Sequence, residues 1–211
     1  MKILSHRGYW KNNEEKNTSV AFSRSFSLGF GTETDVRDCA GRLVISHDMP
    51  LGTELEVDVF LDEALDAWNR LEQLTLALNV KADGMAGVLK SMLLSRPQLD
   101  AFVFDMSVPD MKSYFENDIP VFTRMSEVER DPAWLDKSAG VWLDGFFSEW
   151  YETENIVRLL ETGKRVCVVS SELHKRDFAP LWEKLLPLKT EDRLLLCTDV
   201  PEHAKDFFCA N

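Results

Sequence analysis

The sequence predicts an α/β fold of the (β/α)8 type, the TIM barrel, formed by a single domain of residues 1–211. Short apolar segments alternate with helical patterns almost to the end of the chain. The apolar segments carry Val, Leu and Phe at consecutive positions, as parallel strands buried on both faces do. About eight strand–helix units can be counted, the number that closes such a barrel. A doubly wound open sheet is the alternative.

The elements follow from runs of apolar residues, from helical spacing and from capping residues. Strands are predicted at residues 2–6, 31–39, 74–81, 101–107, 120–127, 140–146, 165–172 and 193–199. Helices are predicted at residues 18–29, 60–71, 84–96, 109–117, 153–163, 178–188 and 201–208. Gly29 and Gly163 end two of the helices, Pro97 stops a third, Pro109 opens a fourth and Thr153 caps a fifth. The apolar segment 42–48 is an extra strand outside the eight.

Composition and charge exclude several classes of protein. The formal net charge of −12 argues against a nucleic-acid-binding surface, which would carry a basic patch. The same charge would repel an anionic substrate unless a cation intervened. The four cysteines are scattered without metal or redox spacing, which favours free thiols in a reducing compartment. Because no apolar run suits a signal peptide or a membrane span, we expect a cytoplasmic protein.

Polar residues stand at the ends of the predicted strands. They are Ser5, His6, Arg7, Glu33, Asp35, Asn79, Lys81, Asp105, Arg124, Glu127, Asp144, Glu172, Thr198 and Asp199, with His47 and Asp48 ending segment 42–48. In a parallel barrel these ends meet at one face, where active sites lie. Residues two apart on a strand share a side, so Glu33 and Asp35 point together, as do Asn79 and Lys81.

This arrangement predicts a metal-dependent acid–base site. Two adjacent carboxylates repel each other unless a proton or a cation joins them. Mg²⁺ or Ca²⁺ with oxygen ligands meets that need, whereas zinc is disfavoured because no cysteine or close histidine pair is at hand. Such an ion would also admit an anion. His6 and His47 can then serve as general acid and base near neutral pH.

Seven short motifs resemble the glycerophosphodiester phosphodiesterase family. They are SHRG (5–8), NTSVAF (17–22), GTETDVRDCAGRLVISHD (31–48), NVK (79–81), TRMSE (123–127), WLDGF (142–146) and CTDVPEHA (197–204). The match runs nearly end to end and in order. Its most specific part is the first 48 residues.

The resemblance implies a TIM barrel with one divalent metal, Mg²⁺ or Ca²⁺, that cleaves a phosphodiester with an alcohol leaving group. Its implied site roles are catalysis by His6 and His47, phosphate contact by Arg7 and Lys81, and metal ligation by Glu33 and Asp35. The third metal carboxylate of the family falls on Asn79, whose carbonyl oxygen can also ligate; Asp105 is the alternative ligand.

Two further departures from the family pattern stand out. Lys16 precedes Asn17 where the family usually has Glu, and Glu15 lies one position away. The insertion that commonly follows the His-Asp pair, and that would recognise glycerol, is nearly absent. Residues 49–59 lead straight into the next helix instead.

One tryptophan, two histidines and one aspartate are further candidates for a role in or near the site. Trp142 lies two before Asp144 on a strand, so it is predicted to wall the substrate pocket. His174 and His203 are predicted to be surface residues, and Asp199 either orients a catalytic group or caps the last helix.

The predicted function is therefore metal-dependent hydrolysis of glycerophosphodiesters or a related small phosphodiester to an alcohol and a phosphomonoester. Two alternatives stay open. One is a non-catalytic barrel that binds a phospho-ligand, and the other is a lyase that stops at a cyclic phosphate. The expected partner is a small phosphodiester, without nucleic acid and without an integral membrane segment; the oligomeric state is not predicted.

Overall fold

The structure is a computed structural model that describes residues 1–68 and 70–210. Position 69, which falls in the predicted helix 60–71, lies outside the described residues. The chain divides into two compact units, Ser5–Val121 and a unit formed by Met1–Leu4 with Phe122–Asn211. The single domain predicted for residues 1–211 stays a prediction. Within the described ranges, no helix is long and apolar enough to cross a membrane.

Eight strands follow the predicted order of the barrel. They are β1 (Lys2–His6), β2 (Gly31–Cys39), β4 (Leu74–Val80), β5 (Leu99–Phe104), β6 (Phe122–Met125), β7 (Gly140–Leu143), β8 (Arg165–Val169) and β9 (Leu194–Thr198). Their order in the sheet is β5-β4-β2-β1-β9-β8-β7-β6. A parallel bridge joins Val103 of β5 to Val121, the residue before β6. The strand order is that of a TIM barrel, so the predicted fold class is confirmed and the open sheet is not.

The extra strand β3 (Arg42–Ile45) pairs antiparallel with β2, as a hairpin outside the eight. Parallel registers place Asp35 of β2 opposite Asn79 of β4, and Asn79 opposite Phe104 of β5. Because side chains alternate along a strand, these registers decide which polar groups share a face of the sheet.

Seven α-helices are described, six between strands and the last after β9. They are α1 (Ser19–Leu28), α2 (Val57–Ala67), α3 (Ala86–Leu94), α4 (Val108–Glu116), α5 (Thr153–Glu161), α6 (Ala179–Leu185) and α7 (Pro201–Ala210). Short 3₁₀ turns add η1 (Asn13–Glu15), η2 (Ser171–His174) and η3 (Leu186–Leu188). Gly29 follows α1 with a left-handed φ of 87°, which confirms the predicted glycine cap.

Two helices differ from their predicted form, and one expected strand–helix unit has no helix. Helix α2 begins at Val57, because Val57, Phe60, Leu61 and Ala64 form one buried face at helical spacing. The predicted helix 178–188 is divided into α6 and η3, where Pro187 cannot continue the α-helical hydrogen bonds. Between β6 and β7, the described residues form turns rather than a helix, so this strand–helix unit lacks its helix.

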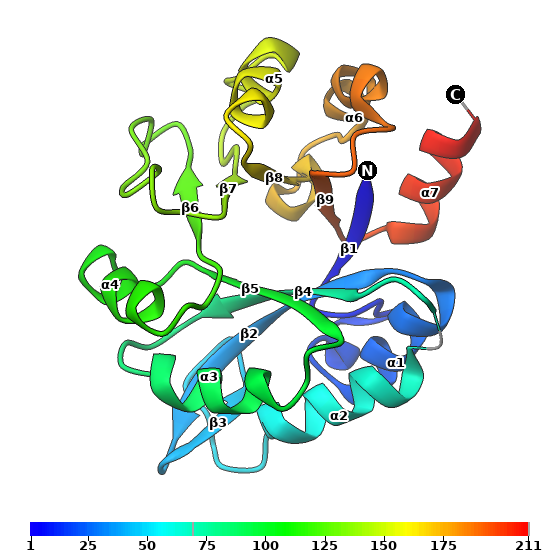
Figure 1. Cartoon of the computed structure of the whole chain (residues 1–211). Coiled ribbons are helices and arrows are strands. Elements are labelled where there is room, and N and C mark those ends of the chain that lie inside the picture. The colour runs from blue at the N-terminus through cyan, green and yellow to red at the C-terminus, as the bar shows by residue number, and fades with distance from the viewer. Residues whose placement is uncertain (69, 211) are drawn as a thin grey trace. The chain divides into compact units, whose positions relative to one another are not determined.

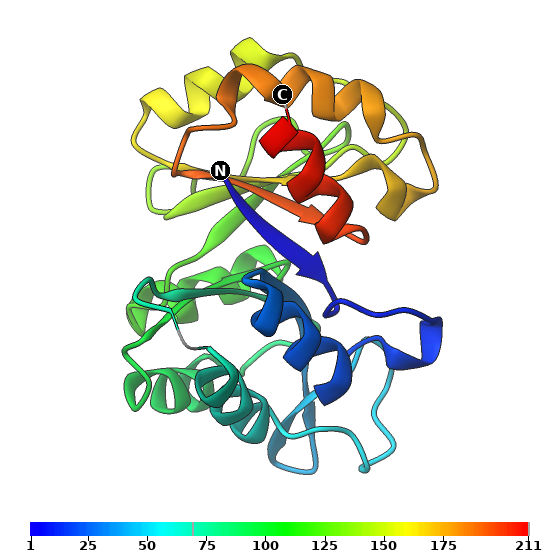
Figure 2. The ribbon, with the colours of Figure 1, turned by 90° about the vertical axis from the view of Figure 1, so that its right-hand side faces the viewer.

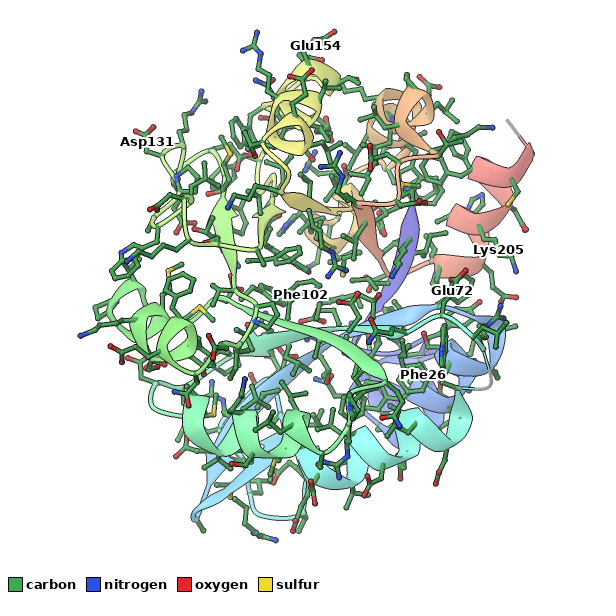
Figure 3. The ribbon with its side chains drawn as sticks, in the orientation of Figure 1. Phe26, Glu72, Phe102, Asp131, Glu154 and Lys205 are labelled. Atoms are coloured by element: carbon green, nitrogen blue, oxygen red, sulfur yellow. The ribbon has the colours of Figure 1, made fainter. Side chains whose placement is uncertain are left out.

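The core of the unit Ser5–Val121 lies between its strands and its helices. Figure 1 shows α1, α2 and α3 along one side of β2, β4 and β5. The rings of Phe22 and Phe60 pack at 4.6 Å between centroids and join α1 to α2. Figure 3 labels Phe26 on α1 and Phe102 on β5, both buried apolar residues of this unit.

The other unit has a separate apolar cluster around Trp182, which is fully buried. Its ring stacks on Phe178 at 4.1 Å, and its Nε1 donates to Ser170 Oγ at 2.8 Å. Figures 1 and 2 both show α5 and α6 on one side of β7, β8 and β9. Leu194 and Val166 are among the strand residues that fill the space beneath these helices.

Candidate active site

The turn after β1 carries the first two predicted site residues, His6 and Arg7. Arg7 has a left-handed φ of 58°, and its backbone N–H donates to the Glu33 carbonyl oxygen at 2.9 Å. Asn17 has a φ of 60°, and its N–H donates to the Arg7 carbonyl oxygen at 2.9 Å. Side chains other than glycine rarely adopt this conformation, and such strain gathers at functional sites.

Gly8 makes this turn possible. Its φ is 80°, and a Cβ atom there would lie 2.7 Å from Cβ and 2.9 Å from the carbonyl carbon of Ala21 on α1. Because no side chain fits, the motif His-Arg-Gly requires its glycine for the close approach of the β1 turn to α1.

Glu33 and Asp35 lie on the same side of β2 and are 2% and 0% exposed. Burial and, after it, the nearby charge of Asp35 raise the pKa of Glu33 to about 7, against the opposite effects of His6, Arg7 and Lys81. Glu33 therefore differs from an ordinary surface glutamate: its negative charge is costly unless a cation joins the pair.

Asp35 is the carboxylate that both cationic side chains of the site contact. Arg7 Nε lies 3.0 Å from Asp35 Oδ2 and Lys81 Nζ lies 3.2 Å from Asp35 Oδ1. Asn17 Nδ2 also donates to Oδ2, at 2.9 Å. Burial opposes ionisation, but the cations of Arg7 and Lys81, the Asn17 hydrogen bond and the charge of His47 together hold the pKa of Asp35 below its ordinary value.

Asn79 is the residue that pairs in register with Asp35, and it is 8% exposed. Its side-chain oxygen Oδ1 is buried and accepts no hydrogen bond from any residue that the structure describes. A buried oxygen without a donor is costly, and a bound cation would satisfy it. In residues 1–68 and 70–210, no group of three His, Cys, Asp or Glu side chains could hold a metal ion, so a site here needs this neutral oxygen.

We call five of these residues the Asp35 cluster: Arg7, Glu33, Asp35, Asn79 and Lys81. His6 adjoins it, since its Nε2 lies 3.9 Å from Glu33 Oε2 and its side chain is 18% exposed. The oxygens of Glu33, Asp35 and Asn79 form a donor set that suits a hard divalent cation, so the residues present fit the predicted ion in type and burial.

His47 lies on the loop after β3 and is 46% exposed. Its Nδ1 is 2.9 Å from Asp48 Oδ1, which leaves Nε2 for proton exchange. A pocket of about 530 Å³ is lined by Arg7, Lys16, Asn17, His47 and nine further residues between Asn13 and Leu55. His47 therefore joins the Asp35 cluster through a shared pocket and through its charge, rather than by direct contact.

The predicted residues thus fall into three groups. Five form the Asp35 cluster, with His6 adjacent and His47 across the pocket. Trp142 belongs to the other unit, where it lies on β7 in register with Arg124 of β6 and Cys167 of β8 and is 4% exposed. Its contact with substrate stays a prediction. Asp105 follows β5 with a left-handed φ of 66°, and its part in ligation also stays a prediction.

Asn17 is a site residue that the sequence reasoning did not single out. It donates to Asp35 through Nδ2, and its Oδ1 accepts from Thr34 Oγ1 at 2.9 Å. These two bonds tie the start of α1 to β2. The signal in the sequence was the Asn-Thr pair of the family motif, which gave the residue type without its partners.

A second polar cluster, in the other unit, comprises Arg124, Asp144 and His174 and is called the Asp144 cluster below. His174 Nε2 is 2.7 Å from Asp144 Oδ1, and Arg124 Nη1 is 3.3 Å from Oδ2. His174 is 24% exposed and meets Phe146 edge-on, so it is partly buried against Asp144 and Phe146, and its predicted surface role stays a prediction. His203 is exposed, as predicted.

The fold can be compared with solved structures over its full length. A glycerophosphodiester phosphodiesterase from Agrobacterium tumefaciens str. C58 matches with a TM-score of 0.68 and 17% identity, covering 100% of both chains. A glycerophosphoryl diester phosphodiesterase from Parabacteroides distasonis ATCC 8503 matches with a TM-score of 0.71 and 12% identity, covering 99% of this chain and 86% of that one. The chain has the fold of these phosphodiesterases.

A third similar structure is a Ca²⁺-dependent phosphatidylinositol-specific phospholipase C from Streptomyces antibioticus. It has a TM-score of 0.57 and 11% identity, and covers 97% of this chain and 95% of that one. No protein-family model matches the chain, and no curated protein matches it. The fold that the sequence motifs implied is confirmed, while the chemistry of the site rests on the residues described above.

Proposed function

We propose that this protein is a metal-dependent phosphodiester hydrolase that cleaves glycerophosphodiesters, or a related small phosphodiester, to an alcohol and a phosphomonoester. The observation that carries the proposal is the Asp35 cluster, where two buried carboxylates, a buried amide oxygen and two cations meet beside His6. The likeness of the fold to two phosphodiesterases supports the same reaction class.

Arg7 and Lys81 act on the phosphate. Both side chains are 21% exposed, so each keeps access to solvent while it contacts Asp35. Their charges favour a phosphodiester anion and share the negative charge that develops on its oxygens. Asp35 holds both groups in place, and it keeps them from spreading apart before substrate binds.

His6 and His47 move the protons. A water oxygen, or a hydroxyl beside the phosphate, forms the new bond to phosphorus, and the bond to the leaving alcohol oxygen breaks with its electron pair. One histidine takes the proton of the attacking oxygen and the other gives a proton to the leaving oxygen. The Asp48 carboxylate orients the ring of His47 for this exchange.

Glu33, Asp35 and Asn79 would hold one Mg²⁺ or Ca²⁺. Such an ion supplies Lewis-acid stabilisation of charge on the phosphoryl oxygens when it is bound. It also offsets the repulsion between the two carboxylates and satisfies the buried oxygen of Asn79. The calcium dependence of one structural neighbour adds support for a divalent cation.

The test is turnover of glycerophosphocholine and of bis(p-nitrophenyl) phosphate with Mg²⁺ or Ca²⁺, followed by product analysis. We expect an alcohol and a phosphomonoester, loss of turnover in EDTA, and recovery when the metal is restored. A cyclic phosphate as the final product would identify a lyase. Binding of the phosphodiester without turnover in any metal would identify a non-catalytic phospho-ligand barrel. Full turnover in chelator would exclude the metal role.

A further inference from the structure

The loop 46–55, which follows β3 and carries His47, presents two large apolar side chains to solvent. Met49 is 77% exposed and Leu51 is 90% exposed. Single exposed apolar residues are ordinary on protein surfaces. Here, however, the two lie two residues apart on one loop, next to a histidine that lines the pocket of the proposed active site.

This loop is held in one shape by polar contacts. At its base, the Ile45 N–H donates to the Leu55 carbonyl oxygen at 2.8 Å, and Val44 bridges to Glu56. At its tip, the carboxylate of Glu54 accepts from the backbone N–H groups of Leu51 and Gly52, at 2.6 and 2.8 Å. The apolar side chains are therefore displayed by an ordered turn.

Arg37 supports the side of the loop that carries Met49. Its Nη2 donates to the His47 carbonyl oxygen at 3.3 Å, and its Nη1 donates to Met49 Sδ at 3.5 Å. The position of Met49 is thereby linked to the backbone of the proposed catalytic histidine. A group that contacts Met49 would lie on the same loop as the proton donor or acceptor.

The walls of the pocket and the tip of the loop differ in chemistry. The pocket wall offers hydroxyl and amide side chains, including Asn13, Asn17 and Ser19, together with Arg7 and His47. Met49 and Leu51 do not line the pocket. A ligand that fills the pocket with a polar phosphate group and extends past the loop would meet the apolar tip next.

We propose that the substrate is an amphiphilic phosphodiester, in which one of the two alcohol groups carries an alkyl or acyl chain that packs against Met49 and Leu51. This inference rests on the proposed hydrolase activity and specifies its substrate class. The exposed Asp48 and the half-buried Glu54 on the same loop are both acidic and disfavour an anionic surface, so the ligand is zwitterionic or neutral outside its phosphate.

The test compares glycerophosphocholine with a lysophosphatidylcholine that has an eight-carbon chain, used below its micelle concentration. We expect kcat/KM for the chain-bearing substrate to be higher by about tenfold, the effect of burying about two methylene groups. Met49→Ser and Leu51→Ser should each lower the ratio of the two kcat/KM values by about fivefold. The matched control is Leu94→Ser at the end of α3, which is 68% exposed and should leave the ratio unchanged.

The outcomes separate this inference from the proposed function. Equal kcat/KM values for the two substrates, or a ratio that neither loop variant changes, would overturn the inference and leave the hydrolase intact. No turnover of either substrate would remove the proposed function as well.

A parallel assay with phosphatidylcholine vesicles distinguishes a free amphiphile from a lipid surface as the source of the chain. A change of oligomeric state in Leu51→Ser, without a change in the ratio, would assign the tip to a second copy of the chain and also overturn the inference.

Discussion

The Asp35 cluster and the Asp144 cluster are both built on parallel strands and the turns after them, one in each unit, yet they differ in how their oxygens are satisfied. Both oxygens of Asp144 have partners: Oδ1 contacts His174 and the Gly145 N–H at 2.7 and 2.8 Å, and Oδ2 contacts Arg124. In the Asp35 cluster, Asn79 Oδ1 has no donor in the described structure.

The two clusters also differ in the number of carboxylates that lie side by side. Asp144 is one carboxylate between a histidine and an arginine. Glu33 and Asp35 are two carboxylates side by side, and burial with mutual repulsion raises the pKa of Glu33 to about 7. A cluster whose groups are mutually satisfied stabilises the fold, whereas one with an unsatisfied buried oxygen and two adjacent buried carboxylates is prepared for a ligand.

The strongest test of this comparison concerns the histidines. We expect His6→Ala and His47→Ala each to lower phosphodiester turnover by about 10²- to 10⁴-fold, the usual loss of a general acid or base. His174→Ala, which removes a partner of Asp144, should change turnover by less than about twofold. Initial rates with glycerophosphocholine, alongside circular dichroism of each variant, give the measurement. A hundredfold loss of turnover in a folded His174→Ala protein would show that the Asp144 cluster also takes part in catalysis.

The second test concerns stability. Asp144→Asn keeps the size of the side chain but removes the negative charge between His174 and Arg124. Because Asp144 is 5% exposed and its partners are partly exposed, we expect the free energy of unfolding to fall by about 2 kcal/mol. Urea denaturation measures it. An unchanged midpoint would show that the Asp144 cluster does not hold its loops together.

The third test restores a carboxylate to the Asp35 cluster. Asn79→Glu should tighten Mg²⁺ binding, on the order of tenfold, because affinity for hard ions rises with ligand charge. Turnover need not rise, since a more neutralised ion is a weaker Lewis acid. Calorimetric titration of Mg²⁺ measures the affinity, and Asp105→Asn is the companion variant. If the affinity drops only in Asp105→Asn, then Asp105 rather than Asn79 completes the ligand set.

The smallest effect is expected at the loop after β7. Glu127 accepts hydrogen bonds from the N–H groups of Phe146, Phe147 and Ser148, at 2.9 to 3.0 Å. Partial burial acts to raise the pKa of Glu127, but these backbone donors hold it below the ordinary 4.5. A depressed folded-state pKa stabilises the protein above the unfolded value, and this stabilisation is lost as the pH falls through the folded value.

We therefore expect Glu127→Gln to flatten the fall of stability below about pH 4.5. The same change at Glu154, an exposed residue on α5 (Figure 3), is the matched control and should leave the pH profile of unfolding unaltered. Parallel profiles for wild type and Glu127→Gln would show that the three backbone bonds do not depend on the charge of Glu127.

Local pattern was sufficient for most of the architecture. Consecutive apolar residues identified all eight barrel strands, and Gly29 marked the end of α1, because strand burial and helix caps depend on neighbouring residues. Pattern was wrong in two places: one of the eight expected strand–helix units has turns in place of a helix between β6 and β7, and Pro187 divides the predicted helix 178–188 into α6 and η3. Element boundaries depend on packing as well as on local preference.

The sequence by itself determined the residue types of the candidate site, since Glu33 and Asp35 share a strand. It also placed Asn79 and Lys81 on one side of a strand. Only the tertiary structure decided that Asp35 takes the positive charge of Arg7 and Lys81. It likewise decided that Asn17 binds Asp35 and that His174 binds Asp144. The two residues of each pair are far apart along the chain, and strand register and the chain crossovers bring them together. A pattern in the sequence does not give the spatial distance between such residues.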